Sequence, residues 1–192
     1  MTIVLTAIIG YLLGSVPVSV LVARAHGVDL YATADGNPGA WNALEQLGGR
    51  RAWPAFIGDA LKGLLGGVTG WLLAGVAGAY TGVAAAMVGH AFPVFMRLRG
   101  GKAVMTFVGG AFALAPIAAA LCLAVCAALS RTHSFALGAR VGVVAFPVAQ
   151  LVFQGVERVM ATGGLMCLIG ALFLFRRTSA PATSASGAPP TR

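Results

Sequence analysis

The sequence alternates between long apolar runs and short polar connections, with one longer polar connection, His26–Arg51, near its beginning. A helix of about 20 apolar residues is long enough to cross the hydrocarbon core of a bilayer. The apolar runs that stand out as spans or parts of spans are Thr2–Ala23, Trp53–Val76, Gly78–Met96, Ala103–Leu129, Val141–Gln154 and Ala161–Phe175. The pattern therefore predicts an all-α integral membrane protein.

The run from Ala103 to Leu129 is 27 residues long and is interrupted at Ala115-Pro116, so it is either one span or a tight hairpin of two short ones. Loop charges separate the alternatives, because cytoplasmic loops are enriched in Lys and Arg. With the hairpin there are seven spans, and every loop cation except Arg158 lies on one face of the membrane. With a single span, seven loop cations lie on one face and five on the other. The cations of that face are Arg24, Arg50, Arg51, Arg97, Arg99, Lys102, Arg131, Arg140, Arg176, Arg177 and Arg192. We predict seven spans, with the N-terminus outside and the C-terminus in the cytoplasm.

Composition narrows the class and the partners. The chain is 58% hydrophobic and only 9% charged, whereas a soluble domain carries about 25% charged residues. A net charge of +8 would suggest nucleic acid for a soluble chain, but the loop bias explains it here, so the expected partner is the lipid bilayer and not nucleic acid. No Lys or Arg precedes the first run, which is therefore expected to be retained and not removed as a signal peptide.

The organisation expected is one membrane-embedded domain over residues 1–177. The remainder, 178–192, is rich in Ala, Ser, Thr and Pro, and is predicted to be a disordered cytoplasmic tail. Cys122 and Cys126 lie four apart in one apolar run and Cys167 lies in another, with no second pair at metal-ligand spacing, so neither a metal nor a cofactor is expected.

Two polar features precede the middle of the chain. Gly36, Asn37 and Gly39, with Asn42, form either a loop whose backbone N–H groups hold an anion or an ordinary turn before a helix. Asp59 and Lys62, three residues apart, share one face of a helix. They are either functional, as ionisable groups at membrane depth usually are, or a self-paired structural ion pair.

A basic hinge lies between two apolar runs, in the stretch Val88–Thr106. His90 ends the first run, and Arg97, Arg99 and Lys102 surround Gly100-Gly101. The glycine pair would let the backbone approach a phosphate, and His90 beside an anion could move a proton near neutral pH. The structural alternatives are that the three cations only anchor the hinge on the cytoplasmic side and that the histidine is a hydrogen-bonded packing residue. A weaker polar cluster comprises Arg131, His133 and Ser134.

Five short blocks occur in order and together resemble a known family, the bacterial acyl-phosphate:glycerol-3-phosphate acyltransferases of the PlsY type. The blocks are Gly14-Ser15-Val16-Pro17, Gly36-Asn37-Pro38-Gly39-Ala40 with Asn42, Gly58-Asp59-Ala60-Leu61-Lys62-Gly63, Gly89-His90-Ala91-Phe92-Pro93 and Gly100-Gly101-Lys102. The resemblance spans roughly residues 10 to 140. It implies a seven-span enzyme of the bacterial cytoplasmic membrane that transfers an acyl chain from acyl phosphate to glycerol 3-phosphate, giving lysophosphatidic acid for phospholipid synthesis.

The resemblance also implies the site. His90 and Lys102 would be catalytic, with Lys102 holding a phosphate. The family is thought to use the substrate phosphate in place of a dedicated protein base. The substrate-binding residues would be Gly36, Asn37, Gly39, Asn42, Asp59, Lys62, Gly100, Gly101, Lys102, Arg131 and Ser134.

The sequence departs from this family where the phosphate would lie. Asp35 and Glu45 stand at positions where the family has Ser and Arg, and Ala103 stands where the family usually has Gly. A like-charge contact at 4 Å costs about 4 kcal/mol at an effective dielectric of 20. Either the carboxylates pair with Arg50, Arg51 or Lys102, or a divalent cation bridges them, or the acceptor is not an anionic phosphate. The alternatives to the leading hypothesis are therefore the same frame and donor with a different acceptor, or a non-catalytic paralogue.

Overall fold

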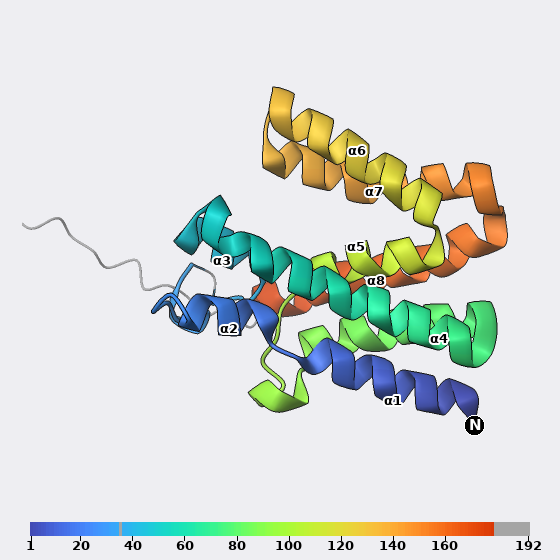
Figure 1. Cartoon of the computed structure of the whole chain (residues 1–192), viewed down its shortest axis with the longest axis horizontal. Helices are drawn as coiled ribbons and strands as arrows, with labels where there is room; N and C mark the ends of the chain where they lie inside the picture. Colours follow the sequence, from blue (N-terminus) through green and yellow to red (C-terminus); the bar gives the residue numbers. More distant parts are fainter. Residues whose placement is uncertain (35, 179–192) are drawn as a thin grey trace, which may run out of the picture.

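The computed structural model describes residues 1–34 and 36–178, and all regular secondary structure in this part of the chain is helical. The long helices lie roughly alongside one another (Figure 1). The helices are α1 (Thr2–Ser15), α2 (Val18–Arg24), α3 (Ala40–Leu47), α4 (Gly49–Ala91), α5 (Val104–Leu114), α6 (Pro116–Thr132), α7 (Phe135–Gln154) and α8 (Val156–Thr178), with short 3-10 helices η1 (Leu30–Ala32) and η2 (Val94–Met96).

Four stretches are long and apolar enough to cross a membrane: Thr2–Arg24, Gly49–Met96, Phe135–Gln154 and Val156–Phe175. The second of these folds back on itself, because Ala74 and Gly75 leave helical geometry, with Gly75 at a φ of 59° that a residue without a Cβ adopts readily. The two arms of α4 pack so tightly that a side chain at Gly70 would overlap the backbone of Gly78.

The interruption at Ala115-Pro116 separates two helices, as the hairpin alternative predicted. Pro116 begins α6, where its missing N–H costs no intrahelical bond, and α5 and α6 run in opposite directions in Figure 1. Three single stretches, the two arms of α4, and these two shorter helices account for the seven apolar segments expected. The prediction of an all-α integral membrane protein is confirmed.

Several predicted boundaries were wrong by a few residues or more. Pro17 divides the first run into α1 and α2, and the second arm of α4 ends at Ala91, since 94–96 form η2. The run predicted to start at Val141 starts at Phe135, because the Ser134 hydroxyl caps α7 by accepting from the Leu137 N–H at 3.2 Å. Arg140, directly before the predicted start, interrupts the apolar run and made the helix look shorter than it is.

The two remaining differences concern the polar connection and the tail. The predicted loop 26–51 contains η1, α3 and the start of α4. The predicted tail begins inside α8, which ends at Thr178; residues 179–192 lie outside the described part of the chain.

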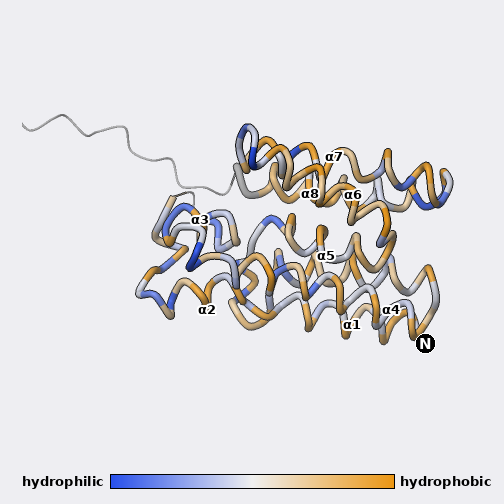
Figure 2. The backbone as a smooth tube through the Cα atoms, turned by 45° about the horizontal axis from the view of Figure 1, so that its top comes forward, coloured by the Kyte–Doolittle hydropathy of each residue, from blue (hydrophilic) through white to orange (hydrophobic). Residues whose placement is uncertain are grey.

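The polar connections between helices gather at one end of the molecule. The α2–α4 region, the 97–102 hinge and the α6–α7 turn lie toward the left of Figure 1, whereas Met1, the turn of α4 and the α7–α8 turn lie toward the right. Apolar positions cover the helices between these ends (Figure 2). The chain therefore brings most of its sequence-predicted site residues to a single end.

Candidate active site

Three buried polar side chains meet where α1, α2 and the two arms of α4 adjoin. Asp59 is 1% exposed, Lys62 5% and His90 7%. The Lys62 Nζ lies 2.7 Å from the Asp59 Oδ1 and 2.9 Å from the His90 Nδ1. These contacts join the third and fourth sequence blocks across the α4 hairpin.

The first block joins the same centre through a break in the helix. Pro17 has no N–H, and the backbone turns between α1 and α2. Lys62 donates to the Val16 carbonyl at 2.9 Å. From α2, the Ser19 hydroxyl donates to the Asp59 Oδ2 at 2.5 Å. The sequence alone gave no reason to single out Ser19, because a serine in an apolar run has no distinguishing spacing.

The fifth block closes over His90. The Gly100 N–H donates to the Ala91 carbonyl and the Gly101 N–H to the His90 carbonyl, each at 3.1 Å. A side chain at Gly101 would overlap the His90 Nε2, and one at Gly100 would overlap the His90 carbonyl. The glycine pair therefore caps the C-terminus of α4 and leaves room for the imidazole ring, a reason different from the phosphate approach that the sequence suggested.

The second block lies beside this centre and is held in place by the side-chain amide of Asn42. The Asn42 Nδ2 donates to the carbonyls of Leu30, Thr33 and Asn37 at 3.0, 3.3 and 3.1 Å, and Asn42 is buried. With its amide protons used within the loop, Asn42 fixes the shape of the segment that carries Gly36, Asn37 and Gly39.

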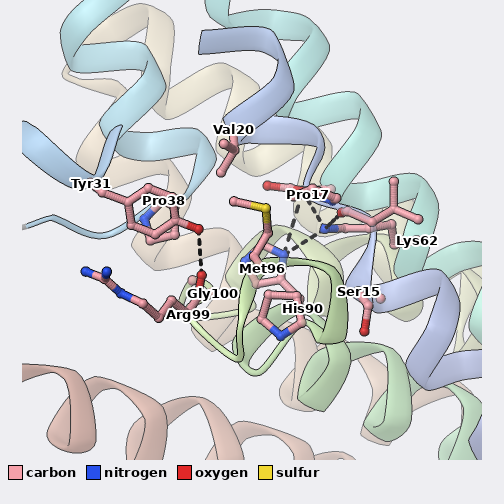
Figure 3. Close-up of a pocket in the computed structure, with 15 residues that line it drawn as sticks. Ser15, Pro17, Val20, Tyr31, Pro38, Lys62, His90, Met96, Arg99 and Gly100 are labelled. Atoms are coloured by element: carbon pink, nitrogen blue, oxygen red, sulfur yellow. Dashed lines mark hydrogen bonds and ion pairs between the residues drawn. The ribbon is translucent and has the colours of Figure 1, made fainter. Parts of the chain in front are cut away.

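A small pocket, with a cavity volume of about 10 Å³, lies between these blocks. Figure 3 shows Lys62 and His90 on one side and Tyr31, Pro38 and Arg99 on the other. The Tyr31 hydroxyl donates to the Arg99 carbonyl at 2.7 Å, and the Arg99 guanidinium lies 5.1 Å from the centre of the Tyr31 ring. Tyr31 was missed at the sequence level, because one tyrosine in a polar connection carries no motif.

The structure brings five predicted site residues to this pocket: Asp59, Lys62, His90, Gly100 and Gly101. Lys102 follows directly, but its Nζ lies 4.9 Å from the centre of the Phe173 ring on α8. The Ser134 hydroxyl is used as the cap of α7, and neither Ser134 nor Arg131 lines the pocket.

Of the two acidic residues that depart from the family pattern, Glu45 lies within the described residues. Glu45 is exposed and accepts from the Trp41 Nε1 at 2.7 Å; it does not line the pocket. Among the described residues, no ion pair joins Glu45 to Arg50, Arg51 or Lys102. Asp35 lies outside the described residues.

The fold and this centre define a multi-span membrane protein with a buried polar site at the end where its loops gather. The family model of glycerol-3-phosphate acyltransferases matches residues 4–183, and the chain belongs to this family. The resemblance drawn from the five blocks is confirmed.

Curated relatives agree. A glycerol-3-phosphate acyltransferase of Rhizobium etli is 36% identical over 85% of this chain and 80% of its own length. One from Rubrobacter xylanophilus is 46% identical over 59% of this chain, and the match spans 57% of that relative.

Solved structures agree as well. The crystal structure of PlsY, an integral membrane glycerol 3-phosphate acyltransferase, in its glycerol 3-phosphate form superposes with a TM-score of 0.76 at 27% identity, covering 93% of this chain and 90% of that one. Its lysophosphatidic acid form gives a TM-score of 0.74 with the same identity.

Proposed function

We propose that this protein is a membrane glycerol-3-phosphate acyltransferase that uses acyl phosphate as its donor and releases lysophosphatidic acid. The observation that carries the proposal is the convergence of four family blocks on one buried centre, made by Val16, Asp59, Lys62, His90 and Gly101. A structural scaffold needs no such centre at membrane depth, where ionisable groups are costly. Family membership supplies the reaction class.

The reaction proposed is a displacement at the acyl carbonyl. A hydroxyl oxygen of glycerol 3-phosphate bonds to the carbonyl carbon, the bond from that carbon to the phosphate oxygen breaks, and inorganic phosphate leaves. The hydroxyl proton leaves on that phosphate, as the family resemblance implies. Cations near the pocket would hold phosphate oxygens: Arg99 lines it, and Lys102 follows Gly101 directly in the chain.

An apolar groove suits the acyl chain of the donor. It has a cavity volume of about 160 Å³ and is lined by side chains of α5, α6 and α7, together with Phe56 of α4. Its lining includes Val104 and Met105, which follow Lys102 by two and three residues. An acyl phosphate whose chain enters this groove would carry its phosphate toward the cationic hinge.

The different-acceptor alternative finds no support in Glu45. A carboxylate repels an acceptor phosphate strongly only where the two are close and poorly solvated, and Glu45 is exposed, bonded to Trp41 and outside the pocket. Glycerol 3-phosphate therefore remains the acceptor proposed.

The localisation proposed is the bacterial cytoplasmic membrane, with the loop-rich end in the cytoplasm. The relatives named above are bacterial. Arg24, Arg50, Arg51 and Arg99 belong to that end, whereas Arg158 begins α8 at the other (Figure 1). This distribution follows the positive-inside bias of cytoplasmic loops.

The donor is tested by giving purified protein glycerol 3-phosphate with a long-chain acyl phosphate, or with the corresponding acyl-CoA as the matched control. We expect lysophosphatidic acid with acyl phosphate as the donor and none with acyl-CoA. The rate with acyl phosphate should fall strongly in Lys102→Ala. Product from acyl-CoA and none from acyl phosphate would overturn the donor. Transfer only to acceptors without a phosphate would overturn the acceptor.

A further inference from the structure

The Lys62 ammonium is held by three groups of the protein. A lysine ammonium has three N–H donors and no acceptor. Three acceptors surround its Nζ: the Asp59 Oδ1 at 2.7 Å, the Val16 carbonyl at 2.9 Å and the His90 Nδ1 at 2.9 Å. Two hydrogen bonds and one ion pair therefore hold the Lys62 ammonium within the protein, although the residue lines the pocket.

Asp59 is the counter-ion of this ammonium. Its Oδ1 contacts Lys62, and its Oδ2 accepts from Ser19 at 2.5 Å. An opposite charge within about 4–6 Å favours the charged form of a buried group. Asp59 is itself 1% exposed, and a carboxylate has no attraction for a phosphate. Its place is behind Lys62 and not against the substrate.

The contact from Lys62 determines which nitrogen of His90 carries the proton. A charged ammonium can only donate, so the Nδ1 must present its lone pair, and a neutral imidazole then holds its proton on the Nε2. The Nε2 lies against Gly101, whose missing side chain leaves the space. Among the described residues, the titratable groups that face the ring are Asp59 and Lys62 from the first arm of α4, and Arg99 across the pocket.

We infer that Lys62 is a positioning residue, with Asp59 as its counter-ion, that holds His90 as the Nε2–H tautomer beside the reaction site. This inference rests on the proposed function for its catalytic meaning, but the hydrogen bond itself does not. His90 so held carries a proton and not a lone pair on the Nε2, and it is therefore not the base that removes the hydroxyl proton. Lys62 and Asp59 then act on the substrate only through His90.

The tautomer is tested by ¹⁵N NMR of histidine-labelled protein in lipid bilayers, in a His26→Gln, His133→Gln background that leaves a single histidine signal set. Both replaced residues are exposed. We expect a protonated Nε2 and an unprotonated Nδ1 near neutral pH. A protonated Nδ1, whether in the other tautomer or in an imidazolium, would overturn the inference without any variant at the site.

Variants then separate positioning from binding. Lys62→Met should abolish the single-tautomer signal and lower kcat about 10²-fold, the scale of a misplaced catalytic group, with little change in the KM for glycerol 3-phosphate. Lys102→Met, which leaves Lys62 in place, should keep the signal of the unmodified protein. A rise in KM with unchanged kcat in Lys62→Met would instead identify Lys62 as a phosphate ligand and contradict the inference.

The two proposals fail in different ways. Protein that shows the Nε2–H tautomer and transfers no acyl group supports the hydrogen bond and overturns the proposed function. Protein that transfers acyl groups but has a protonated His90 Nδ1 supports the proposed function and overturns the inferred tautomer.

Discussion

Ala103 is held at the N-terminus of α5 with a φ of 58°, in the left-handed region that disfavours a side chain. The family usually has glycine at this position, and the structure gives the reason. A non-glycine residue in this conformation costs about 1–3 kcal/mol, whereas the buried methyl group contributes about 0.8 kcal/mol.

Ala103→Gly should therefore stabilise the protein by about 1 kcal/mol, since relief of the strain exceeds the lost burial. The measurement is thermal unfolding in detergent. Ala119→Gly serves as the control, because Ala119 is a buried residue inside α6, where glycine should destabilise. A lower midpoint in Ala103→Gly than in the unmodified protein would contradict this account of the turn.

Glu45 should matter little to the use of glycerol 3-phosphate. Its carboxylate is exposed and is bonded to Trp41, and exposed charges contribute at most about 1 kcal/mol. Glu45→Gln is expected to change the KM for glycerol 3-phosphate by less than about fivefold in steady-state assays. A KM for glycerol 3-phosphate that is lower by tenfold or more in Glu45→Gln would contradict this, because it would show that the carboxylate faces the acceptor.

At the scale of elements, the glycines at four-residue spacing permit the helix contacts that position the site. A side chain at Gly63 would overlap the Thr106 carbonyl of α5, and one at Gly109 would overlap the Ala60 carbonyl of α4. Small residues four apart, such as Gly63 and Gly67, let helix backbones approach closely, but sequence spacing alone does not identify the partner helix, because spacing identifies a face and not its neighbour.

Gly109→Ala should force α5 away from the first arm of α4, which carries Asp59 and Lys62. Overpacking of this kind costs about 1–3 kcal/mol. Gly164→Ala on α8 is the matched control, since nothing lies within 4 Å of a side chain there. Thermal unfolding should show a large drop for Gly109→Ala and almost none for Gly164→Ala; equal effects would contradict the packing.

The elements also explain why part of the site could not be predicted. Asp59 and Lys62 were identified because they share a helix face, and their contact at 2.7 Å agrees. The contact from Lys62 to His90 depends on the hairpin of α4, which brings together residues 28 apart. The capping role of Ser134 could not be predicted, because a serine that caps a helix and a serine that binds an anion have the same local sequence.

For the whole molecule, the charge distribution predicts the orientation in the membrane. The end with Arg24 and Arg50 should face the cytoplasm, and the end with Gly155 and Arg158 the outside. After Cys122, Cys126 and Cys167 are replaced by Ala, a single cysteine at Gly155 should react with a membrane-impermeant maleimide in intact cells, and one at Gly48 only after lysis. The opposite pattern would invert the orientation.

The central claim is that the converging blocks form the substrate pocket. It is tested most directly by a cryo-electron microscopy structure of the full chain in nanodiscs with saturating glycerol 3-phosphate. We predict the phosphate between His90 and the Arg99–Gly101 segment, with Lys62 still bonded to Asp59, Val16 and His90. A phosphate held by Lys62 itself, or bound near Arg131 and Ser134 with this pocket empty, would contradict the account.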